Sequence, residues 1–213
     1  MRLFRFIIGI ILIPVAIILT IGFIKSFAFL QEVKHSEVVF LSGFLSYLIL
    51  HFLFYKPIFM HVMAHEFTHA IWAIIFGGKV KSLNISEDGG NITVDKTNFL
   101  IILAPYFFPF YTVLVILLYF IVDKRFIDFV IFFIGFTLSF HLALTLFSMK
   151  ERQKDLKEVG VFFSLSFIYC VNLLIMAIIF SVISPQFYIL NFFNEIWKIL
   201  LGIGDLICPS CQT

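Results

Sequence analysis

Charged residues are scarce in this sequence, since Asp, Glu, Lys and Arg make up 13% of its 213 residues while hydrophobic residues make up 62%. A soluble domain of this length could not cover its surface with so few polar side chains. The formal net charge is +2 and the lysines are scattered along the chain, which argues against a nucleic-acid-binding protein. The composition therefore predicts a protein that crosses the membrane several times.

Cysteine is scarce too, because the chain holds three. Cys170 lies in an apolar run, and Cys208 and Cys211 form a single CxxC pair. So few cysteines exclude a disulfide framework, and one CxxC pair without a second is weak evidence for a redox or metal site.

Long apolar runs separated by short polar segments predict an all-α polytopic membrane protein with about six transmembrane helices. We interpret the first run as a retained span, because it is longer than the apolar core of a signal peptide and no small-residue cleavage site follows it. Together the spans would form a single membrane-embedded domain over residues 1–213. The predicted spans are approximately residues 4–30, 38–54, 57–77, 98–122, 126–148 and 159–184.

The segments between and after these spans carry predictions of their own. Residues 79–95 alternate apolar and polar side chains around a glycine pair, which predicts a membrane-associated β-hairpin. Residues 149–158 have the composition of a charged loop, and residues 187–203 mix aromatic and polar side chains as expected of a helix at the membrane interface. Pro105 and Pro109 interrupt the fourth span and predict a kinked helix.

The third predicted span carries the sequence His65-Glu66-Phe67-Thr68-His69. On a helix, His65 and His69 share one face, so both imidazoles can bind one metal ion while Glu66 reaches a water bound to it. Ionisable side chains at membrane depth are costly unless something compensates them, and a bound dication does so. The motif therefore predicts a metal-dependent hydrolase, with Zn2+ as the metal.

A catalytic zinc ion usually has three protein ligands, so a third must come from elsewhere in the chain. His141 in the fifth span lies about as far from the end of its helix as His69 does, and by alternation both ends emerge on the hairpin side. Asp155 is the other candidate, although it lies in the predicted charged loop and would have to dip into the membrane. The residues alone leave the choice between His141 and Asp155 open.

A resemblance to a known family adds to this interpretation. It covers roughly residues 38–180 and rests on the motif, the hairpin, Gly77-Gly78, and the segments 96–99 and 104–109. In these features the chain resembles the site-2 protease family of intramembrane zinc metalloproteases, particularly its small B-type-like branch.

The resemblance implies that His65 and His69 bind zinc and that Glu66 is the general base. In that family the third ligand is an aspartate within a Leu-Asp-Gly segment, which this sequence lacks. The nearest candidate is Asp155, which Leu156 follows directly. This makes Asp155 and His141 equal candidates.

The resemblance also implies peptide hydrolysis within the membrane, with single-span membrane proteins as substrates. A transmembrane helix must unwind before cleavage, and an exposed strand edge at residues 79–95 could bind the unwound segment as an added strand. Asn98 could hydrogen-bond the same backbone, or it could cap the helix that it precedes. No PDZ or CBS domain is recognisable, so either this core or a regulatory partner selects substrates.

Three other functions fit parts of the pattern. They are a membrane metal transporter, a b-type haem protein using histidines such as His51, His61 and His141, and a family member that has lost catalysis. Neither of the first two explains why Glu66 follows His65.

The charge distribution gives an expected orientation in the bilayer. The predicted location is the cell membrane. Assigning the loops alternately to the two sides places more lysine and arginine on the hairpin side, which predicts a cytoplasmic hairpin. Arg2 and Arg5 argue for the opposite orientation.

Overall fold

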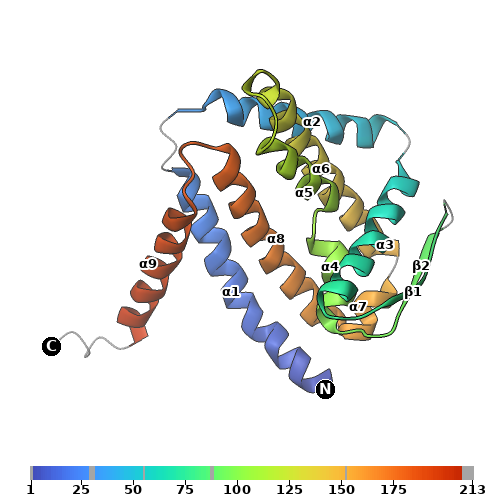
Figure 1. Ribbon diagram of the computed structural model, residues 1–213. Coiled ribbons are helices and arrows are strands. Elements are labelled where there is room, and N and C mark those ends of the chain that lie inside the picture. The colour runs from blue at the N-terminus through green and yellow to red at the C-terminus, as the bar shows by residue number, and fades with distance from the viewer. Residues whose placement is uncertain (1, 29–31, 55, 87–88, 152, 208–213) are drawn as a thin grey trace.

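The computed structural model describes residues 2–28, 32–54, 56–86, 89–151 and 153–207. These residues are mostly helical, and their only sheet is a small antiparallel hairpin, which confirms the predicted all-α membrane fold with a β-hairpin. The elements are α1 (Arg2–Ala28), α2 (His35–Leu53), α3 (Ile58–Ile75), β1 (Val80–Ser86), β2 (Gly89–Val94), α4 (Phe99–Phe107), α5 (Phe110–Tyr119), a 3-10 turn η1 (Lys124–Phe126), α6 (Ile127–Glu151), α7 (Gln153–Val159), α8 (Val161–Ile183) and α9 (Ile189–Ile207) (Figure 1).

In the described chain, five helices are long and apolar enough to cross a membrane, namely α1, α2, α3, α6 and α8. α4 and α5 meet this criterion only as a pair, and they are bent by 66° at the break between them. Pro109 explains the break, because it has no N–H with which to continue α4 and it stands at the N-cap of α5. The fourth span, predicted as one kinked helix, is therefore two short helices.

The hairpin lies beside the motif helix α3 (Figure 1). Its strands pair in antiparallel register, with Val80 opposite Val94 and Ser86 opposite Gly89. Gly77 joins α3 to the hairpin with a positive φ of 69°, a conformation that suits a residue without a side chain. The chain therefore turns sharply at the end of α3, and both strands contact that helix.

Glycines allow α2 and α6 to cross at very short distance. A Cβ atom on Gly43 would overlap the carbonyl oxygen of Phe132, and one on Gly135 would overlap that of Phe40. Small residues permit such close approach in a membrane, where packing rather than the hydrophobic effect holds helices together. The crossing fixes α6, whose far end leads into the site.

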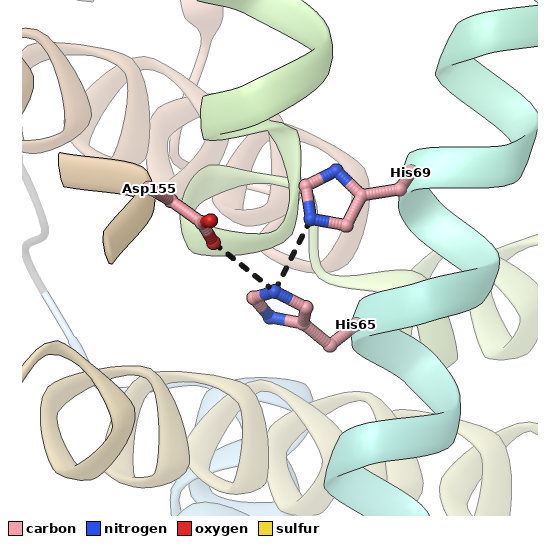
Figure 2. Close-up of side chains that lie close together, drawn as sticks. All are labelled: His65, His69 and Asp155. Atoms are coloured by element: carbon pink, nitrogen blue, oxygen red, sulfur yellow. Dashed lines mark hydrogen bonds and ion pairs between the residues drawn. The ribbon is translucent and has the colours of Figure 1, made fainter. Parts of the chain in front are cut away.

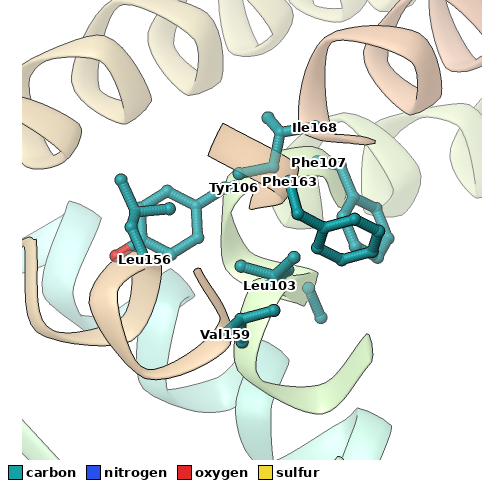
Figure 3. Packing of buried hydrophobic residues seen from close by; sticks show 8 residues of the cluster. Leu103, Tyr106, Phe107, Leu156, Val159, Phe163 and Ile168 are labelled. Atoms are coloured by element: carbon teal, nitrogen blue, oxygen red, sulfur yellow. The ribbon is translucent and has the colours of Figure 1, made fainter. Parts of the chain in front are cut away.

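Residues 149–158, predicted as a charged loop, are mostly helical instead, because α6 continues to Glu151 and α7 follows it. The reason is amphipathicity: Leu156 and Val159 are buried while Lys154, Lys157 and Glu158 are exposed. Figure 3 shows both side chains packed with apolar residues of α4 and α8. This cluster holds α7 close to α4.

The start of α1 lies beside the end of α7. Nη1 of Arg5 donates a hydrogen bond of 3.0 Å to the carbonyl oxygen of Val159, at a helix end where basic side chains are favourable. α7 also shares a cavity with the hairpin, so Arg5 is on the hairpin side. Strict alternation of α1, α2 and α3 would put it on the opposite side, and the alternation assumed from the sequence is therefore wrong for these helices.

Candidate metal centre and active site

The HExxH residues lie on the inward face of α3. This helix runs from Ile58 to Ile75, close to the predicted span. His65 and Glu66 are only 6% and 4% exposed. Buried ionisable groups in an apolar helix need partners, and those partners come from α4, α7 and the hairpin.

Three potential metal ligands converge beside α3 (Figure 2). Nε2 of His65 lies 3.2 Å from Nε2 of His69 and 3.5 Å from Oδ2 of Asp155. One ligand atom from each residue lies within 4.8 Å of the other two, and the described residues contain no other such group of His, Cys, Asp or Glu. Two imidazoles and a carboxylate are donors that zinc binds.

The main chain of α4 orients His69. Its Nδ1 lies 2.8 Å from the carbonyl oxygen of Ile101. A carbonyl only accepts, so Nδ1 carries the proton and Nε2 keeps a lone pair for a metal. This carbonyl is available because its helical partner would be the N–H of residue 105, which is proline. Pro105 thus frees the group that sets the His69 tautomer.

Tyr106, to which the sequence analysis assigned no role, holds Asp155. Its hydroxyl donates to Oδ2 of Asp155 at 2.9 Å, and its ring meets His65 edge to face with centroids 5.4 Å apart. Burial raises the pKa of Asp155, but interactions with the imidazoles of His65 and His69 and the hydrogen bond from Tyr106 outweigh burial and leave that pKa below its usual value. Asp155 is therefore an ionised carboxylate. The one available signal for Tyr106 was a phenol in an apolar span, which needs a partner.

The hairpin covers Glu66. A Cβ atom on Gly90 of β2 would lie 2.7 Å from Oε1 and 2.8 Å from Cδ of Glu66, so only glycine leaves room for the carboxylate. Glu66 and β2 line a cavity of about 890 Å³ that His65, His69 and Asp155 also line. This volume is in the range of ligand-binding sites. The site thus brings a carboxylate and three ligand atoms to one accessible space.

A comparison with protein families identifies the chain's relatives. A family model described as Peptidase M50B-like matches residues 38–151, which is more than half of the chain. The chain belongs to this family. The match confirms the resemblance to site-2 proteases, and the apolar helices of this M50B-like chain make it a multi-pass membrane protein. No curated protein and no solved structure matches it.

The match to the M50B-like family ends before α7, so the position of Asp155 in the site rests on the geometry alone. His141, the other sequence candidate, is not part of the three-residue group. His141 nevertheless lies near α3, because it lines a much smaller cavity together with His61 and His65 of that helix.

Asn98 and Asn172 support the helices of this M50B-like protein. The Asn98 side chain accepts a hydrogen bond of 2.9 Å from the N–H of Ile101, which makes it the N-cap of α4. Asn98 does not line the large cavity. Nδ2 of Asn172 donates to the carbonyl oxygen of Tyr106 at 3.0 Å, next to the break between α4 and α5. Asn172 therefore bonds across helices, as expected for a polar residue in a span.

Proposed function

We propose that this protein is an intramembrane zinc metalloprotease, which hydrolyses peptide bonds of transmembrane substrates. The observation that carries the proposal is the convergence of His65, His69 and Asp155 next to Glu66 on the wall of one cavity. Membership of a peptidase family supports the same reaction class.

The donor set suits zinc. Ligand atoms bound tetrahedrally at about 2.0–2.2 Å lie roughly 3.3 Å from one another. The separations of 3.2 and 3.5 Å at Nε2 of His65 are close to this value. We assign His65, His69 and Asp155 as the protein ligands, with Asp155 preferred to His141 because it belongs to the group. A zinc ion held there would polarise the scissile carbonyl and acidify a water molecule.

Glu66 is the proposed general base. It follows a metal ligand directly on α3 and lines the same cavity, so its carboxylate can reach a water molecule that attacks the substrate carbonyl. Glu66 takes a proton from this water and passes it to the leaving amine. Because Glu66 is buried and packed against Gly90, its position is fixed before substrate arrives.

The hairpin is the proposed substrate-binding element. The described sheet has two strands, so each strand has one edge without a strand partner. Residues 89–92 and Val94 of β2 line the cavity. An unwound substrate segment added to β2 would lie over Glu66, extended and ready for attack. Single-span membrane proteins are therefore the expected substrates.

The cytoplasmic side is the proposed side of the hairpin. Arg5 contacts the end of α7, and Lys154 and Lys157 of α7 line the same cavity as the hairpin. Arg5, which in the sequence argued against this orientation, thus lies on the same side as Lys154 and Lys157, in agreement with the positive-inside tendency. The cell membrane is the expected location.

Metal analysis and a cleavage assay test the proposal. Purified protein is expected to hold about one zinc ion per chain and to cleave a single-span substrate in liposomes. His65→Ala, His69→Ala and Asp155→Ala each remove a donor, so zinc and cleavage should both be lost. His35→Ala is the control, since His35 pairs with Asp128 on the surface. A haem absorption band, or zinc retained in all three variants, would contradict the proposal.

Gly90→Val should lower the cleavage rate by roughly 100-fold or more, within the range attributed to a general base. The new side chain would occupy the space of the Glu66 carboxylate and displace it from the cavity. Zinc content should not change, because Gly90 contributes no ligand. Thr93→Val is the control: it changes an exposed residue of the same strand that does not line the cavity. Equal cleavage by both variants would mean that the hairpin does not position Glu66.

A further inference from the structure

The two motif histidines differ in the hydrogen-bond partner of Nδ1, the ring nitrogen that does not face the metal site. Nδ1 of His69 donates to the Ile101 carbonyl, which fixes that ring. Nε2 of His65 faces His69 and Asp155, and its other nitrogen lies on the far side of the ring from them (Figure 2). Within the described residues no side chain or carbonyl hydrogen-bonds to that nitrogen. A histidine that binds a metal normally has such a partner.

His65 also lines a second, much smaller cavity, on the α6 side of α3. Its volume is about 10 Å³, and its polar walls include His61, His65, Thr68, Tyr111 and His141. This is close to the space that one water molecule needs. Several polar walls make it a place that water can occupy, unlike an apolar gap of the same size.

His141 brings an unsatisfied atom to this cavity. Its Nε2 is buried and has no hydrogen-bond partner among the described residues. A polar atom left without a partner at membrane depth is costly. Asn172 lies beside the His141 ring, and its amide nitrogen donates to the carbonyl oxygens of Tyr106 and Ile168. The Asn172 oxygen is therefore left to accept from Nδ1 of His141.

We propose that His141 is a positioning residue that fixes the metal-binding tautomer of His65 through one water molecule. Nδ1–H of His65 donates to the water, the water donates to Nε2 of His141, and Nδ1–H of His141 donates to Oδ1 of Asn172. Every group then has a partner, and Nε2 of His65 keeps its lone pair for the metal. This inference rests on the proposed metal centre and gives His141 a role other than that of a ligand.

Zinc affinity, measured by competition with a chelator, tests the proposal independently of cleavage. His141→Leu should weaken zinc binding by about 10- to 100-fold, as loss of such an outer partner does in other sites. His141→Gln should restore most of the affinity, because its amide can still accept from the water. Ser139→Ala is the control: Ser139 is another buried, unpartnered polar residue of α6, and it does not line the cavity.

Unfolding curves of the metal-free variants show whether each is folded, and His141→Phe replaces His141→Leu if the latter is not. Unchanged zinc affinity in the folded His141→Leu or His141→Phe variant would overturn the inference. Complete loss of zinc, as expected for His65→Ala, would overturn it as well, because His141 would then be a ligand. If the unaltered protein binds no zinc, the proposed function itself fails, which is a distinguishable result.

Discussion

Glu66→Gln should stop cleavage while leaving zinc in place. Glutamine has nearly the same shape but cannot take a proton from water, and general-base catalysis contributes about 10²- to 10⁴-fold to a rate. Glu66 is not part of the group of three ligand atoms, so the zinc content should stay at about one ion per chain. The measurements are cleavage of a single-span substrate and metal content of the same preparation.

Glu158→Gln offers a matched control for this experiment. Glu158 is a second carboxylate that lines the same cavity, but it is on α7, outside the HExxH motif, and is exposed to solvent. The same chemical change there should leave the cleavage rate nearly unchanged. If both variants lost activity equally, the effect would come from the charge of the cavity and not from a base at Glu66.

Gly135→Ala should destabilise the protein strongly. The new Cβ atom would overlap the carbonyl oxygen of Phe40, so α2 and α6 would have to move apart. Overpacking costs about 1–3 kcal/mol, and main-chain atoms cannot move aside as a side chain can. The midpoint of thermal unfolding in detergent should fall by several degrees.

Gly202→Ala is the control for this substitution. Gly202 lies in α9, and nothing is within contact distance of a Cβ atom there. Replacing a helical glycine by alanine in open space stabilises a helix by roughly 0.5–1 kcal/mol. The unfolding midpoint is therefore expected to fall for Gly135→Ala and to rise for Gly202→Ala. Equal unfolding midpoints would show that the α2–α6 crossing is not held by close main-chain contact.

The local features of the fold could be predicted from the sequence because they depend on neighbouring residues. Hydrophobic run length gave most of the spans, since a bilayer sets the length of the helix that crosses it. The spacing of His65 and His69 put both on one helical face, and the alternation in residues 79–95 gave the hairpin. Each of these signals is contained within about twenty residues.

The remaining features depend on contacts between distant segments. Asp155 was predicted to lie in a loop because its neighbours are charged, and the i, i+3 spacing of Leu156 and Val159 was too short a pattern to indicate that they pack against α4. The role of Pro105 depends on His69 reaching the carbonyl that this proline leaves open. Alternation of spans failed because nothing near Arg5 in the sequence indicates its contact with Val159.

The distance along the chain between α3 and α7 determines when the proposed metal centre is completed during synthesis. On the ribosome, His65 and His69 are synthesised long before Asp155, and between them come the hairpin, the broken helix pair and α6. A nascent chain that has not yet produced α7 holds two of the three proposed ligands and lacks the carboxylate that Tyr106 positions. Under the proposed function, the metal centre is therefore incomplete during insertion, and cleavage of neighbouring membrane proteins would begin only after α7 is in place.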